Sequence, residues 1–85
     1  MKVYVLIQCS EDDKNIVCIS KERDTLVAWL EREAENRRAS KGVISCDVVW
    51  EDEGMAFLQG AFRYEPNSQV YDYFEEYIID EHEVV

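Results

Sequence analysis

Histidine, proline and glycine are scarce in this 85-residue chain, which contains one histidine (His82), one proline (Pro66) and three glycines. The glycines, Gly42, Gly54 and Gly60, are too scattered to form a phosphate-binding loop. A cysteine nucleophile needs a histidine base, and the only histidine lies close to the end of the sequence. We therefore expect neither enzyme activity nor a bound cofactor.

A disulfide framework is also absent from the cysteine spacing. Cys9, Cys18 and Cys46 are an odd number with no short separation, which indicates a reducing, cytoplasmic environment. Together with His82 they amount to four zinc-ligand types, but no pair has zinc-knuckle spacing. Cys18 and Cys46 fit equally well as small apolar core residues, so we predict no metal site.

Long hydrophobic runs are absent. The stretch Val3–Ile7 is too short for the apolar part of a signal peptide, and nothing approaches the length of a membrane span. The aromatic content is that of a folded chain. We expect one domain, residues 1–85, and no membrane partner.

Basic residues are almost missing from the second half of the chain. Residues 47–85 hold eleven acidic side chains and Arg63 alone, whereas residues 1–46 hold eight of each sign, so the net charge of −10 belongs to the second half. Such a field repels nucleic acid and attracts basic proteins. The alternative is that these acids only keep the protein soluble.

One amphipathic helix is predicted between Ser20 and Gly42. Ser20 fits an N-cap, and Gly42 fits the left-handed residue just past the helix end. Glu33 and Arg37 are four residues apart, in the order that favours an ion pair. A single apolar stripe follows helical spacing: Leu26, Val27, Leu30 and Ala34.

The sequence before this helix predicts a β-hairpin of Lys2–Cys9 and Asn15–Ile19. The first strand is apolar on both faces, which is typical of a strand inside a sheet. A turn centred on Asp12–Asp13 places Ile16 opposite Cys9.

A second hairpin is predicted after the helix, from Val43–Trp50 and Met55–Tyr64. Gly54 suits the left-handed position of a bulged hairpin loop. Gly60, inside the second of these strands, indicates a bulge or a bend.

The last segment, residues 69–85, fits two structures. As a strand it has Tyr71, Tyr73 and Tyr77 on one face, and as a helix it has an apolar stripe. We favour a strand from about Phe74 to Val84, preceded by a turn of helix around residues 70–74. The fold is then α+β, with a mainly antiparallel sheet in the order β-β-α-β-β-β, or with the last element helical, covered on one face by the helix.

Acidic and aromatic side chains of the second half are the candidate binding residues. Acids along one edge of the sheet imitate the phosphates of DNA, and tyrosines combine contact area with a polar tip. The candidate acids are Glu51, Asp52, Glu53, Asp72, Glu75, Glu76, Asp80, Glu81 and Glu83. The candidate aromatic contacts are Tyr71, Tyr73 and Tyr77. We expect a small acidic module that binds a basic protein, and the alternative is a self-associating homodimer without an inhibitory role.

Three stretches carry a resemblance: Lys2-Val3-Tyr4-Val5-Leu6, Ile19-Ser20-Lys21-Glu22 and Tyr77-Ile78-Ile79-Asp80-Glu81-His82-Glu83-Val84. They resemble small uncharacterised proteins of phages and bacterial mobile elements. The resemblance implies a phage-encoded protein in the host cytoplasm that binds and blocks a nucleic-acid-binding or defence protein, as anti-CRISPR proteins do. These stretches coincide with strand and helix boundaries, so the resemblance assigns no site residues.

Overall fold

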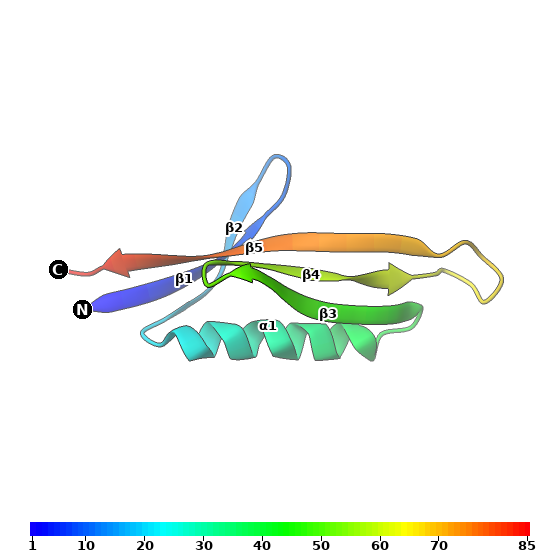
Figure 1. Ribbon diagram of the computed structural model, residues 1–85, viewed down its shortest axis with the longest axis horizontal. Coiled ribbons are helices and arrows are strands. Elements are labelled where there is room, and N and C mark those ends of the chain that lie inside the picture. Colours follow the sequence, from blue (N-terminus) through cyan, green and yellow to red (C-terminus); the bar gives the residue numbers. More distant parts are fainter.

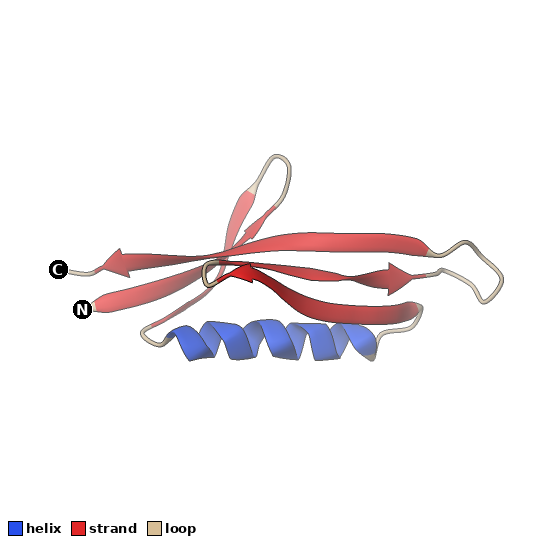
Figure 2. Ribbon diagram, in the orientation of Figure 1, coloured by secondary structure: helices blue, strands red, loops and turns tan.

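The computed structural model describes residues 1–85 and contains five strands and one helix in the order β-β-α-β-β-β (Figure 1). The elements are β1 (Lys2–Cys9), β2 (Lys14–Ser20), α1 (Arg23–Arg38), β3 (Val43–Asp52), β4 (Met55–Phe62) and β5 (Tyr71–Glu83). All paired strands are antiparallel, and the single helix lies along one side of the sheet (Figure 2). The predicted α+β fold is confirmed. The helix is neither long enough nor apolar enough to cross a lipid bilayer.

β5 is the central strand that holds two hairpins together. The sheet order is β2-β1-β5-β4-β3, so the predicted interior position of β1 is confirmed. β1 pairs with residues 76–83 of β5, whereas β4 pairs with residues 71–78. Because the two hairpins overlap on β5 only at residues 76–78, the molecule is long, at 55 × 25 × 19 Å. Figure 1 shows β5 running along the whole body, with the β1–β2 hairpin turning away from it.

The core cluster is small and lies on one side of the sheet, and the one buried residue outside it, Val5, lies on the other face of β1. Leu26, Leu30 and Ala34 follow one another at four-residue spacing, so they form one buried stripe on α1. They pack against the sheet residues Leu6, Cys46, Ala56, Leu58 and Tyr77. Only nine of the 85 residues are buried.

The ends of α1 agree with the prediction only in part. Ser20 is not the N-cap: the helix begins at Arg23, and its N-cap, Glu22, has no capping side-chain hydrogen bond. The Ser20 hydroxyl instead accepts a hydrogen bond from the Glu22 N–H (3.1 Å), which closes a tight turn before the helix. Gly42 has a φ of +89°, the left-handed conformation that was predicted.

The register predicted for the first hairpin is wrong by two residues at its turn. Lys14, not Ile16, pairs with Cys9, and Ile16 lies opposite Ile7. The reason is a four-residue turn, 10–13, closed by a backbone hydrogen bond of 2.8 Å between its first and last residues.

The two glycines of the second hairpin have other roles than those predicted. Gly54 does not adopt a left-handed conformation; its N–H donates to the carboxylate of Asp52 (2.7 Å), which closes the turn. Gly60 pairs with Cys46, and the nearby irregularity lies in the partner strand, between Val43 and Ser45, opposite Ala61 and Phe62. A side chain at Gly60 would place its Cβ 1.9 Å from the Ser45 carbonyl oxygen, so glycine is needed for backbone approach.

The last segment is a strand along its whole length. β5 begins at Tyr71 rather than Phe74, so the expected turn of helix is wrong, and so is the helical alternative. β4 ends at Phe62, two residues before the predicted end at Tyr64. β5 is favoured as a strand because β1 and β4 together supply backbone partners along its length.

Candidate protein-interaction surface

The sheet face opposite α1 has no covering layer. Side chains alternate along a strand, so the residues next to the buried core positions point to this face. Its large apolar side chains are Ile7, Ile16, Ile19, Met55, Phe57, Phe74 and Ile78, and we call this surface the open face. Phe74 is 71% exposed and Ile16 is 66% exposed. On this face the rings of Phe57 and Phe74 meet edge-on, with centroids 6.0 Å apart.

A row of three acids crosses the open face along β5. Asp72, Glu76 and Asp80 alternate there with Phe74 and Ile78. Residues four apart on a strand are about 13 Å apart, so the row extends over roughly 26 Å. None of the three pairs with a lysine or arginine. Asp80 lies 4.0 Å from the imidazole of His82, which is the only such contact in the row. The open face therefore combines exposed apolar contact area with negative charge that no lysine or arginine neutralises.

The other acids predicted for the binding surface do not join this row. Glu81 pairs with Lys2 (3.1 Å), and Glu83 pairs with the amino group of Met1 (3.2 Å). Glu51 and Asp52 are the last residues of β3, and Glu53 lies in the turn before β4. The nine candidate acids therefore do not form one continuous track.

Glu75 lies on the helix side and links three elements. Its carboxylate accepts hydrogen bonds from Arg37 (2.8 Å), Tyr77 (2.9 Å) and Gln8 (3.0 Å). Arg37 also donates to Glu33 (3.2 Å), which is the ion pair predicted from the sequence. Burial alone would raise the pKa of Glu75, but the hydrogen bonds and the Arg37 charge outweigh it and lower that pKa. The role of Glu75 is to connect β5 to α1 and β1.

The three candidate tyrosines have different surroundings. Tyr77 is 1% exposed and belongs to the core. Tyr73 is half-buried, and its hydroxyl donates to the Ser45 carbonyl (3.3 Å); burial raises its pKa to about 12. Tyr71 is exposed and stacks on Phe62, with centroids 5.6 Å apart. Tyr71 is therefore the most accessible of the three.

The cysteines and the histidine are dispersed. Cys46 is buried under α1, while Cys9 and Cys18 lie on opposite faces of the β1–β2 hairpin. No three side chains of the metal-binding types are grouped as a metal ion requires.

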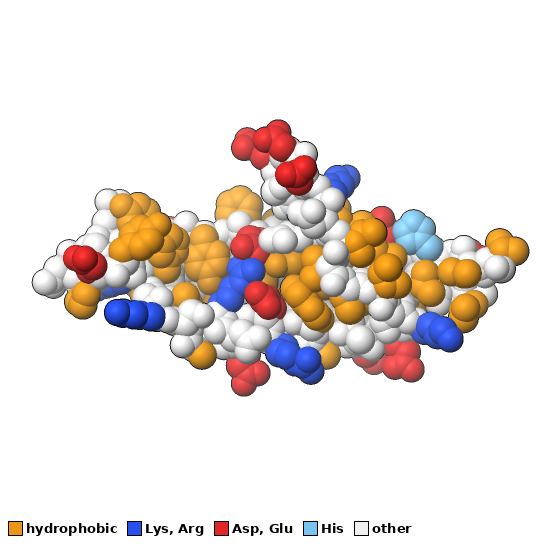
Figure 3. All heavy atoms as spheres, turned by 180° about the vertical axis from the view of Figure 1, so that it is seen from behind, with side chains coloured by type: hydrophobic (Ala, Val, Ile, Leu, Met, Phe, Trp, Pro, Cys, Tyr) orange, Lys and Arg blue, Asp and Glu red, His pale blue; other side chains and the backbone are white.

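Charge and apolar surface are both spread over the long body. Figure 3, the view from behind Figure 1, shows acidic side chains at the tip of the projecting β1–β2 hairpin. In the same view hydrophobic side chains extend along the body and gather at the end where β4 joins β5.

No protein-family model, curated protein or solved structure matches this chain. The structure itself defines a class: an α+β domain with a one-sided core and a bare sheet face that is apolar and acidic.

Sequence reasoning missed Phe74 and Ile16 as exposed residues of the candidate surface. The signal for Phe74 was the two-residue alternation along β5, which places it opposite the tyrosine face. The two-residue register error leaves Ile16 on the same face of the sheet, and its exposure follows from the edge position of β2 and the bare face there.

Proposed function

We propose that this protein is a small non-enzymatic binding module that docks a basic partner protein on its open face. The observation that carries the proposal is the acid row Asp72, Glu76 and Asp80 among exposed apolar side chains. An antiparallel sheet with one face in water normally carries polar residues there. A contiguous exposed apolar surface is typical of an interaction site.

The amount of exposed surface supports this proposal. The accessible surface is 6078 Å², and a compact monomer of 10.0 kDa exposes about 5,200 Å². The surplus of roughly 800 Å² is about what one partner contributes to a standard protein–protein interface.

The acid row favours a partner whose contact surface is positively charged. Apolar contacts supply affinity, and complementary lysines or arginines supply specificity and rapid association. A second copy docked on the same face brings acid rows against each other, which disfavours a face-to-face homodimer. Self-association is the second candidate function, because the surplus surface and the free edge of β2 also suit a dimer.

We extend the proposal to the class of partner. Proteins that bind nucleic acid present basic surfaces, and an acidic module competes with nucleic acid for them. The resemblance to small phage and mobile-element proteins adds that the partner is a nucleic-acid-binding or defence protein in a bacterial host cytoplasm. The proposal includes no cofactor, metal, membrane or direct nucleic-acid contact.

The experiment is capture of proteins from bacterial lysate on immobilised protein, with elution by increasing salt and identification by mass spectrometry. The test variant carries D72K, E76K and D80K on the open face. The matched control carries E11K, D12K and D13K in the turn between β1 and β2, and has the same net charge.

We expect one basic protein that elutes with salt, binds the control variant and is lost from the test variant. Duplex DNA added to the purified partner should displace the module. Capture that survives reversal of the acid row contradicts the proposal. Recovery of this chain alone, with a dimer mass in sedimentation equilibrium, favours the homodimer.

A further inference from the structure

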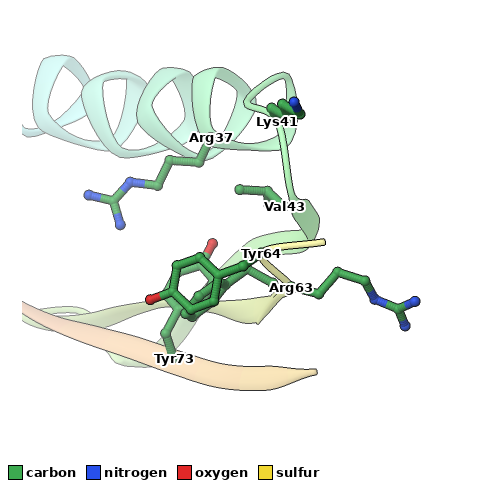
Figure 4. A pocket seen from close by; sticks show the side chains of 7 residues that line it. Arg37, Lys41, Val43, Arg63, Tyr64 and Tyr73 are labelled. Atoms are coloured by element: carbon green, nitrogen blue, oxygen red, sulfur yellow. The ribbon is translucent and has the colours of Figure 1, made fainter. Parts of the chain in front are cut away.

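A second concave surface lies on the helix side of the sheet, away from the open face. It is a cavity of about 480 Å³ between the end of α1, the start of β3 and the far ends of β4 and β5 (Figure 4). This volume is within the range of small-molecule sites. The walls are formed by Arg37, Lys41, Val43, Phe62, Tyr64 and Tyr73, together with the stem of Arg63.

The side chains that line this pocket include cations but no acid. Three of the nine basic residues line it, and no acidic residue does, although the net charge of the chain is −10. Arg37 is held by Glu33 and Glu75, but Lys41 pairs with no carboxylate. Lys41 is therefore the cation available to a ligand.

The cations at the end of α1 do more than complement the helix dipole. The last carbonyl groups already accept backbone hydrogen bonds, such as those from Ala39 and Ser40. Arg38 bonds to the Cys46 carbonyl (2.7 Å) and lies near Asp47, so it belongs to the fold. These contacts explain Arg38 and leave Lys41 without a structural partner.

Aromatic rings form the opposite wall. Phe62 and Tyr64 meet edge-on with centroids 5.3 Å apart, and Phe62 and Tyr73 lie 5.9 Å apart. Tyr64 is 75% exposed, so its ring is available for stacking. Figure 4 shows Tyr64 and Tyr73 below the helix end, with Arg37 on α1 and Lys41 in the turn after it above them, and the guanidinium of Arg63 directed away.

We propose that this pocket binds a small planar anion, whose ring stacks on Tyr64 and whose negative group faces Lys41. Aromatic walls alone would also suit a cation, but the unpaired charge of Lys41 disfavours a cationic ligand. The chemistry is shared by nucleoside monophosphates and aromatic carboxylates. The site does not rest on the proposed partner binding, because it lies on the other side of the sheet.

The test is titration of the ¹⁵N-labelled protein followed by NMR. The probes are AMP and benzoate, which are planar anions. Two fragments serve as comparisons: adenosine, which lacks the charge, and inorganic phosphate, which lacks the ring. We expect saturable shifts at the amides of Val43, Phe62 and Tyr64, with AMP or benzoate at least about tenfold tighter than either fragment. If AMP binds more tightly, the ligand class is a nucleoside monophosphate, and if benzoate binds more tightly, it is an aromatic carboxylate. No saturable shift at these amides, or a fragment that binds equally well, overturns the proposal.

Two exposed positions separate a real site from general charge attraction. K41E and Y64A should each weaken binding of the tighter probe by about fivefold or more. For Y64A the reason is the loss of one aromatic stack, which costs that much or more. K14E in the distant β2 is the matched control, because it makes the same charge change at another exposed lysine. Equal weakening by K14E and K41E, or unchanged binding by Y64A, contradicts the proposal.

Discussion

Glu75 shows how one side chain makes the fold depend on pH. Its carboxylate joins Arg37 of α1, Gln8 of β1 and Tyr77 of β5, and about a third of the side chain remains exposed (32%). The pKa of Glu75 is lower in the folded chain than in the unfolded chain. Its stabilisation is therefore present above the unfolded pKa and is lost as pH falls through the folded pKa.

At this residue scale we predict that E75Q loses roughly 1–2 kcal/mol at neutral pH, a value discounted for the partial exposure. E75Q should also lose less stability than the unsubstituted protein as pH falls. Urea unfolding at a series of pH values, followed by circular dichroism, measures both effects. E31Q is the control, because Glu31 is exposed on α1 and makes no ion pair. Parallel pH profiles for E75Q and the unsubstituted protein would contradict this role.

At the scale of elements, β5 and its neighbours differ in how firmly they are held. β4 and β5 are each bonded to strands on both sides, whereas β2 is an edge strand bonded only to β1. The pairing of β2 is also irregular near Val17, which has no partner across the strand. The β1–β2 hairpin projects from the body, where fewer contacts protect it.

We therefore predict that β2 has the lowest hydrogen-exchange protection of the five strands, and β4 and β5 the highest. Local opening of an edge hairpin costs less free energy than separation of central strands. Amide exchange resolved by NMR measures the order directly. Protection of β2 equal to that of β4 would show that the edge hairpin opens only with the whole domain.

At the scale of the whole molecule, shape and charge act together. The Cα radius of gyration is 14.6 Å, whereas a compact domain of this length has about 12 Å. The elongation follows from the short overlap of the two hairpins on β5, and it leaves the open face exposed. The net charge of −10 opposes association of copies.

We predict an elongated monomer of 10.0 kDa at low salt, with self-association that grows as salt screens the acid rows. Sedimentation velocity at low and high salt measures mass and frictional ratio together. The D72N/E76Q/D80N variant, whose rows carry no charge to repel each other, should lose most of this salt dependence. A compact dimer at low salt would contradict the prediction.

The sequence by itself determined the order of the first five elements, the buried stripe of α1 and the Glu33–Arg37 ion pair. These features depend on local periodicity and on residues three or four apart, which one stretch of chain specifies. It also placed the negative charge in the second half and the left-handed residue at Gly42.

Only the tertiary structure decided where the long-range partners lie. The two-residue error at Ile16 and the full length of β5 depend on turn geometry and on strands distant in sequence. The same is true of the acids: Glu75 and Glu76 are neighbours, yet strand alternation places one in an internal ion pair and the other on the open face. The sequence shows which half of the chain is acidic. The pairing of β5 with β1 and β4 decides which of those acids face a partner.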